Sequence, residues 1–280
     1  MGDVHPFLGI AGALKAQGHR VSFLTNQVFE DIAIEAGLEF HAIGTMLDAQ
    51  STLNDPHLWH PRKGFEVLWR SSLPAQRLIA DFLIRQPDAA ELVVIAHPLA
   101  LPGAVTARDR IPGQRLIGTY LAPGNLRTTH DPMRLGPILM PRWVPQSWRR
   151  WMWQRIDKDI LDPPALPDIN ALRASHGLTP IRSYVQLLYD AADCSLLLFP
   201  EWFAAPMPDW PQRLVRTDFP LFDSFAAQPL GDDLQQFLAA GEPPIVFTFG
   251  SAMSQAGGAL AGSAEAWRRL GRGGVLLPLV

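Results

Sequence analysis

The sequence predicts an α/β fold built on doubly wound parallel sheets. Apolar runs of strand length alternate with helical patterns, as in the succession Glu91–Ala96, Ala100–Arg110 and Arg115–Thr119. The first of these runs is continuously apolar, which is typical of a parallel strand covered by helices on both faces. Gly18 and Gly37 stand where two of the predicted helices should end. We therefore expect a succession of β-α-β units.

The chain begins on a turn, followed by a helix and a strand. An apolar stripe with helical spacing runs from Phe7 to Leu14, and Val21–Thr25 is a β-rich run. Further helices are expected over Phe29–Ala36, Gly64–Arg85 with a break considered near Pro74, Trp143–Ile160, Ile169–His176, Asp232–Ala240 and Ala264–Leu270. Further strands are expected over Leu38–Ile43, Ser195–Phe199, Pro244–Phe249 and Val275–Leu279, and loops over Met46–Pro61 and Tyr120–Pro141.

Composition narrows the class of protein. The 280 residues are 48% hydrophobic and carry a formal net charge of −3, so charge gives no case for binding nucleic acid. Cys194 is the single cysteine, which excludes an internal disulfide framework and a thiolate metal cluster. The first residues lack a signal-peptide pattern, and the most apolar run, Leu92–Val105, is too short to span a bilayer. We expect a cytoplasmic protein.

Three segments carry a resemblance to a known family. Gly2–Phe7, followed by a helix and Gly18–Val21, resembles the N-terminal motif of GT-B glycosyltransferases of the sterol, macrolide and glycopeptide group. Pro243–Ser251 resembles the strand that opens the donor domain of these enzymes. Asp55–Trp69, paired with Phe199–Asp223, is similar to the rhamnosyltransferase of rhamnolipid synthesis and its relatives.

The resemblance implies a domain organisation. Residues 1–223 would form a Rossmann-like acceptor domain, 224–242 a linker with a short helix, and 243–280 the opening β-α-β unit of a Rossmann-like donor domain. The family's first strand would precede Met1 and would be central in the sheet. Most of the donor domain would follow Val280. We therefore expect residues 1–280 to fold loosely and to transfer no sugar without these parts.

The same resemblance assigns the catalytic base. Displacing a nucleoside diphosphate by an acceptor hydroxyl needs a group that takes the hydroxyl proton. Asp3 stands where the family's base stands, at the N-terminus of the first helix, where the helix dipole favours a carboxylate. The alternative is that Asp3 caps this helix. His5 and His97 are candidate substrate contacts, because His5 is close to Asp3 and His97 follows a predicted parallel strand.

The donor side is represented by Gly250 and Ser251. A glycine turn after a strand can offer N–H groups and the Ser251 hydroxyl to a diphosphate, although it can equally be an ordinary turn. The sequence shows no Asp-X-Asp motif of the kind that holds a nucleotide-sugar cation, so we expect no metal and no cofactor beyond a nucleotide-sugar co-substrate. The family's later His-X-Gly-Gly loop does not occur in residues 1–280.

A segment rich in Trp and Arg, Trp143–Ile160, admits three interpretations. The favoured one is an amphipathic helix with its aromatic side in the core and its arginines in solvent. In the second, Trp143 and Trp151 line the pocket of a small hydrophobic acceptor. In the third, the helix makes a peripheral contact with the inner face of a membrane.

These observations predict an inverting, metal-independent glycosyltransferase that moves a hexosyl or deoxyhexosyl group to a lipidic or other small-molecule hydroxyl. Two alternatives to this prediction remain open. In the first, the chain is a non-catalytic module that binds an acceptor or a partner. In the second, it is a GT-B sugar-nucleotide epimerase.

Overall fold

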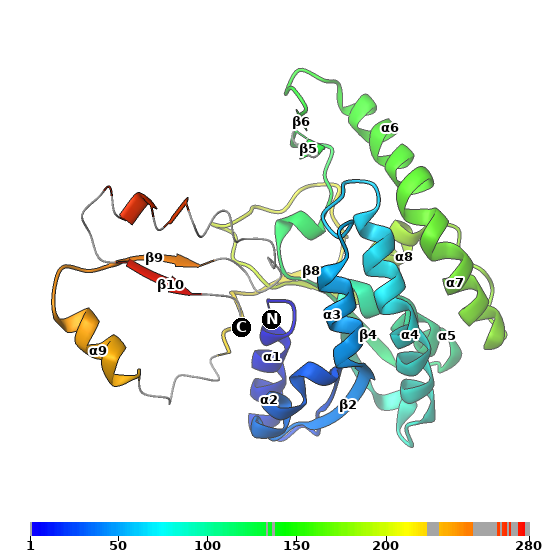
Figure 1. The fold of residues 1–280 in the computed structure, drawn as a ribbon. Coiled ribbons are helices and arrows are strands. Elements are labelled where there is room, and N and C mark those ends of the chain that lie inside the picture. The colour runs from blue at the N-terminus through cyan, green and yellow to red at the C-terminus, as the bar shows by residue number, and fades with distance from the viewer. Residues whose placement is uncertain are drawn as a thin grey trace. The chain divides into compact units, whose positions relative to one another are not determined.

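The structure is a computed structural model that describes residues 2–132, 134–135, 138–222, 230–248, 262–263, 265–267, 269 and 274–277. The chain divides into two compact units (Figure 1). The larger unit is Pro6–Pro220, and the smaller one combines Leu221–Val280 with Met1–His5. We describe each unit by itself.

The larger unit is built on a four-stranded parallel sheet. Its strands are β3 (Val93–Ala96), β4 (Arg115–Tyr120), β7 (Cys194–Leu197) and β8 (Leu214–Arg216), in that spatial order. Ile117 lies opposite Ile95 on one side and Cys194 on the other, which fixes the register. A second parallel pair joins β1 (Ser22–Asn26) to β2 (Glu39–Gly44). The sequence predicted these parallel strands, β8 excepted.

Within the described residues, β1 pairs with β2 and β3 pairs with β4, and β1 and β3 do not pair with each other. Val93 on β3 is 56% exposed, an unusual position for an apolar side chain of a parallel strand. The sequence predicts a further strand between these two edges. Its presence in the protein stays a prediction.

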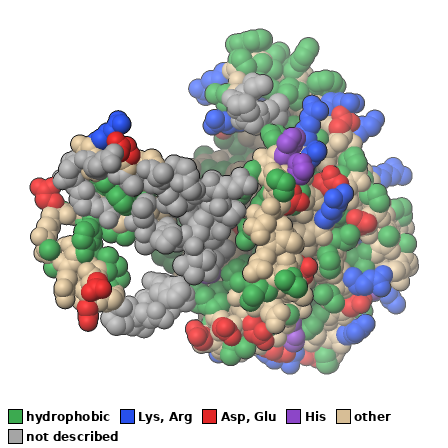
Figure 2. Space-filling view, viewed as in Figure 1, with side chains coloured by type: hydrophobic (Ala, Val, Ile, Leu, Met, Phe, Trp, Pro, Cys, Tyr) green, Lys and Arg blue, Asp and Glu red, His purple; other side chains and the backbone are tan. Residues whose placement is uncertain are grey.

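Helices surround these strands. They are α1 (His5–Ala16), α2 (Glu30–Glu35), α3 (Met46–Asn54), α4 (Gly64–Arg85), α5 (Leu101–Arg110), α6 (Gln146–Ile156), α7 (Asp162–Ser175) and α8 (Tyr184–Asp190). A π-helical turn, η5 (Asp157–Leu161), joins α6 to α7. The short 3-10 turns are η1 (Gln27–Phe29), η2 (Ala89–Glu91), η3 (Pro98–Ala100) and η4 (Pro123–Asn125). An antiparallel hairpin of β5 (Arg134–Leu135) and β6 (Ile138–Leu139) precedes α6. Charged side chains are distributed among apolar ones over the surface in Figure 2.

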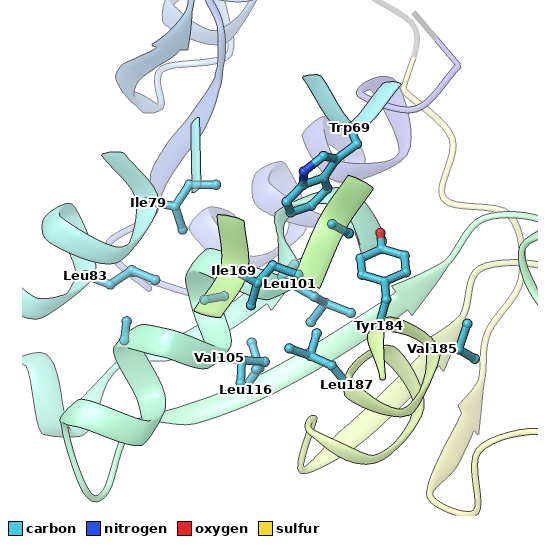
Figure 3. Packing of buried hydrophobic residues seen from close by; sticks show 14 residues of the cluster. Trp69, Ile79, Leu83, Leu101, Val105, Leu116, Ile169, Tyr184, Val185 and Leu187 are labelled. Carbon is cyan, nitrogen blue, oxygen red and sulfur yellow. The ribbon is translucent and has the colours of Figure 1, made fainter. Parts of the chain in front are cut away.

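The core lies where α4, α5, α7 and α8 meet the sheet (Figure 3). α4 and α5 approach closely because Gly103 has no side chain: a Cβ at that position would lie 2.5 Å from the carbonyl oxygen of Gln76. The buried Gln76 amide accepts a hydrogen bond from the Gly103 N–H and donates one to the Leu99 carbonyl. The Trp69 indole donates to Asp168, which fastens α4 to α7.

One prediction of a loop is wrong. Residues 46–61 were expected to be irregular, yet α3 occupies Met46–Asn54. Thr45 caps this helix by accepting from the Asp48 N–H, while the Asp48 carboxylate accepts from the Thr45 N–H. This Thr-x-x-Asp capping box is visible in the sequence and outweighs the weak apolar pattern of the segment. α4 continues through Pro74, so the break considered there is absent.

The smaller unit contains α9 (Asp232–Ala239) and a parallel pair, β9 (Ile245–Thr248) with β10 (Gly274–Leu277). The described residues from 262 to 269 that lie between these strands are helical. This confirms the predicted β-α-β unit. Assignment of the two units to acceptor and donor domains stays a prediction. In the part of the chain that the structure describes, no helix is long and apolar enough to cross a membrane.

Candidate functional site

Asp3 lies on the turn formed by residues 2–4, directly ahead of α1. Its side chain is exposed. The first helical residue is His5, so Asp3 is one position too early to be the residue that caps the helix. Among the described residues, no hydrogen bond or ion pair engages the Asp3 carboxylate, which leaves both oxygens accessible to a substrate. The cap alternative is therefore not supported by the geometry.

His5 begins α1, and its ring lies against Phe222 with the ring centroids 5.9 Å apart. Burial lowers the pKa of His5 below its ordinary value, so the imidazole is neutral over more of the physiological range. A neutral imidazole can donate one hydrogen bond and accept another. The predicted substrate contact at His5 is not tested by these contacts and stays a prediction.

His97 directly follows β3 and lies at its carboxyl end, as the sequence predicted. Its Nδ1 accepts a hydrogen bond from the Leu99 N–H at 3.2 Å, which fixes the ring and caps η3. The ring also meets Phe7 of α1, edge to face, with centroids 6.1 Å apart. These contacts orient the imidazole at the sheet edge where α/β proteins bind ligands.

The loop after β4 is held by a carboxylate from a distant segment. Asp209 accepts hydrogen bonds from the Thr128 hydroxyl, the Thr129 N–H and the Thr129 hydroxyl. Burial alone would raise the pKa of Asp209, but these hydrogen bonds outweigh it and hold the pKa below its ordinary value. Sequence reasoning missed this clamp because its partners lie 80 residues apart.

Arg127 supports the same loop. Its guanidinium donates to both oxygens of Asp157 on η5, and it lies over the rings of Trp153 and Tyr189 at 5.7 and 5.9 Å from their centroids. The Tyr189 hydroxyl accepts a hydrogen bond from the backbone N–H of Arg127. A π-helical turn often marks a functional segment. Here it brings Asp157 to the arginine that anchors the loop.

The face of α6 that packs inward differs from the one that the sequence favoured. Arg149 is buried, and its guanidinium donates to the carbonyl oxygens of Thr129, His130 and Arg142. Trp148 and Trp151 are 63% and 55% exposed. The interpretation of this helix as aromatic-in and arginine-out is therefore wrong for Arg149, Trp148 and Trp151. It is right for Arg150 and Arg155, which are exposed.

The two tryptophans predicted to contact an acceptor are both exposed. Trp143 is 81% exposed and precedes α6, and Trp151 lies on the outer face of that helix. A pocket of about 390 Å³ lies beside β8, where Met207, Trp210 and Arg216 contribute to its walls. The acceptor role of Trp143 and Trp151 stays a prediction.

The predicted donor contacts Gly250 and Ser251 lie outside the described residues. Within the ranges that are described, no three His, Cys, Asp or Glu side chains come together in a way that could hold a metal ion. The described geometry therefore concerns the turn before α1 and the loops that follow β3 and β4.

Comparison with known proteins identifies relatives. Residues 1–113 match the model of the glycosyltransferase family 28 N-terminal domain. The chain is 26% identical over 268 residues to the O-mycaminosyltylonolide 6-deoxyallosyltransferase of Streptomyces fradiae, covering 89% of this chain and 59% of that protein. It is also 36% identical over 80 residues to a sterol 3-beta-glucosyltransferase of Arabidopsis thaliana, covering 27% of this chain and 11% of that protein.

Solved structures show the fold. The kitacinnamycin glycosyltransferase matches 98% of this chain and 62% of its own with a TM-score of 0.61 at 19% identity. The calicheamicin glycosyltransferase matches 94% of this chain and 58% of its own with a TM-score of 0.56 at 16% identity. The chain spans about three fifths of the length of these relatives. Residues 1–113 are thus similar to the family 28 N-terminal domain, and the chain has the α/β fold of the GT-B glycosyltransferases.

Proposed function

We propose that the protein to which this chain belongs transfers a hexosyl or deoxyhexosyl group from a nucleoside-diphosphate sugar to a hydroxyl of a small apolar molecule. The observation that carries the proposal is the accessible Asp3 carboxylate at the N-terminus of α1, in a domain similar to those of glycosyltransferases. Relatives named for transfer of a deoxyallosyl group and for transfer of glucose to a sterol support the sugar and acceptor classes.

Asp3 acts as the general base in this proposal. Its carboxylate accepts the proton of the acceptor hydroxyl while that oxygen bonds to the anomeric carbon and the bond to the nucleoside diphosphate breaks. Because attack occurs opposite the leaving group, the anomeric configuration inverts. The α1 dipole favours the ionised form of the base before the reaction begins.

The substrates are held by other groups. His97, oriented by Leu99 and Phe7 at the carboxyl end of β3, is proposed as an acceptor contact. His5 is proposed as a further acceptor contact, whereas the exposure of Trp143 and Trp151 does not favour the acceptor contacts predicted for them. Gly250 and Ser251 are proposed to donate to the diphosphate, which would neutralise part of the leaving charge without a metal. The chain spans about three fifths of the length of its relatives, so the activity is proposed for the whole protein.

The test is Asp3→Asn in the full-length protein. The amide cannot accept the hydroxyl proton, so kcat should fall by about 10²–10⁴ while the dissociation constant for the nucleotide sugar is unchanged. Asp31→Asn is the matched control, because Asp31 is an exposed carboxylate in the first turn of α2. A variant that keeps more than about a tenth of the wild-type kcat would show that Asp3 is not the base.

Two further measurements examine the rest of the proposal. The anomeric configuration of the product, compared with that of the donor, distinguishes inversion from retention. Turnover in the presence of a chelator tests metal independence. A protein that converts free nucleotide sugar without an acceptor would be an epimerase, and one that binds an acceptor without turnover would be a binding module.

A further inference from the structure

The outer surface of the segment from β6 to α6 carries an unusual group of exposed apolar side chains. We call it the tryptophan face, and it consists of Leu139, Trp143, Trp148 and Trp151, which are 64%, 81%, 63% and 55% exposed. The rings of Trp148 and Trp151 neighbour each other, with centroids 6.3 Å apart. Figure 2 shows hydrophobic side chains gathered over this segment at the top of the view. Exposed aromatic groups of this kind mark interaction surfaces.

These tryptophans are exposed even though α6 has another face that packs against the protein. α6 already packs against the rest of its unit through the buried Arg149 and through Trp153, whose indole donates to the Thr128 carbonyl. Trp148 and Trp151 lie on the other side of the helix. Their exposure is therefore a property of how this helix is anchored, and a partner can reach them without rearranging the fold.

The segment that carries this face also carries exposed cations. Arg142, Arg150, Arg155 and Lys158 are exposed, whereas Asp159 is the exposed acid of this stretch and pairs with Arg155. Residues 139–160 carry a net charge of +3 in a chain whose net charge is −3. Lys and Arg are visible beside the hydrophobic group in Figure 2. The surface thus combines indole rings with a local excess of cations.

We propose that the tryptophan face docks on the interface of an anionic lipid bilayer, with α6 lying along the surface. Indole rings prefer the headgroup level, where the ring is apolar and its N–H remains hydrated. Arg150, Arg155 and Lys158 add electrostatic attraction to anionic headgroups. This helix anchors the protein peripherally and does not span the bilayer.

Charge decides against two other occupants. A second copy of this chain in a two-fold interface would place the same cations opposite one another, and like charges across an interface are unfavourable. A small apolar acceptor would account for the indoles but would leave the cations around them without a role. An anionic lipid surface satisfies both features of the face at once.

The test measures partitioning of the full-length protein onto sucrose-loaded vesicles by sedimentation. One vesicle type contains phosphatidylcholine alone, and the other contains about one third phosphatidylglycerol. Binding should require the anionic lipid and should weaken when the salt concentration is raised from about 0.1 M to 0.5 M.

The variants separate the two features of the face. The double variant Trp148→Ser, Trp151→Ser should lower the partition coefficient about tenfold or more, because each indole buries a large apolar area at the interface. Arg150→Gln should lower it about fivefold. The matched control is Trp59→Ser with Arg62→Gln, since Trp59 is 64% exposed on another surface segment and Arg62 is an exposed cation beside it.

Three results would overturn the proposal: no binding to anionic vesicles, equal binding to both vesicle types, or an equal loss of binding in the control variant. Light scattering adds another criterion. A dimer that the tryptophan substitutions dissociate, without vesicle binding, would assign the face to a second copy. If the double variant fails to melt cooperatively, Arg150→Gln and the salt dependence still decide, because Arg150 is an exposed residue whose loss should not affect folding.

Discussion

Arg149 makes the most specific prediction about stability. Replacing it by Met keeps the apolar stem but removes the guanidinium that donates to Thr129, His130 and Arg142 at 3.0, 3.2 and 2.7 Å. Each such bond contributes about 1 kcal/mol net, so the free energy of unfolding should fall by about 3 kcal/mol. For a unit of this size the expected decrease in Tm is about 6–12 °C.

The neighbouring Arg150 provides the control. It is exposed, so Arg150→Met should change stability by no more than about 0.5 kcal/mol. Urea titration, followed by tryptophan fluorescence and circular dichroism, measures both variants. A buried charge also carries a desolvation cost, and among the described residues the Nε of Arg149 has no partner. If Arg149→Met proves as stable as Arg150→Met, that cost cancels the three bonds and the anchoring role is refuted.

Two further predictions concern the core and the loop clamp. Gly103→Ala should destabilise the larger unit by about 2–3 kcal/mol in thermal melts, because its Cβ would lie 2.5 Å from the backbone oxygen of Gln76. Gly12→Ala, a helical control with nothing within 4 Å of the added Cβ, should instead stabilise by up to about 1 kcal/mol. Asp209→Asn should be less stable than the wild type at pH 7, because the pKa of Asp209 is lower in the folded protein. That difference should disappear as pH falls below about 4 and through the folded pKa, and a difference independent of pH would contradict the clamp.

Most of the larger elements could be predicted from the sequence because their signals are local. The apolar runs of β3 and β4 and the glycine stops at Gly18 and Gly37, both of which adopt positive φ, are properties of short segments. α3 was missed although its capping box is also local, since the expected loop was read from prolines and turn residues further along. β8 has only three residues, too few for a periodic pattern.

The orientation of α6 could not be predicted in this way. Trp148 and Trp151 fall on one helical face, whereas Arg149 and Trp153 fall on the other, so each face offers aromatic and cationic groups. What selects the inner face is a set of backbone carbonyls on the loop after β4, which need donors once buried. That requirement belongs to the tertiary structure. Hydrophobic periodicity alone does not contain it.

The candidate site also contains some residues that local motifs predict and others that only the tertiary structure reveals. Asp3, His5 and His97 could be named because a resemblance and the rule for parallel strands apply to short motifs. The Asp209 clamp and the Arg127–Asp157 pair join segments far apart in the chain, and single-sequence reasoning has no means of pairing them. These missed residues hold the loop and are not themselves placed to react, so single-sequence reasoning named candidate reacting groups but not the contacts that support the loop.

The contact between Phe7 and His97 connects the unpaired strand edges to the proposed chemistry. It places the start of α1 at the carboxyl end of β3. In a doubly wound sheet, a helix starts there when it follows a strand adjacent to β3, because each crossover begins at the carboxyl edge. β1 and β3 do not pair with each other among the described residues, and the strand predicted between them stays a prediction. His97 directly follows β3, and Asp3 would directly follow the predicted strand, so one rule for parallel strands names both residues as candidates.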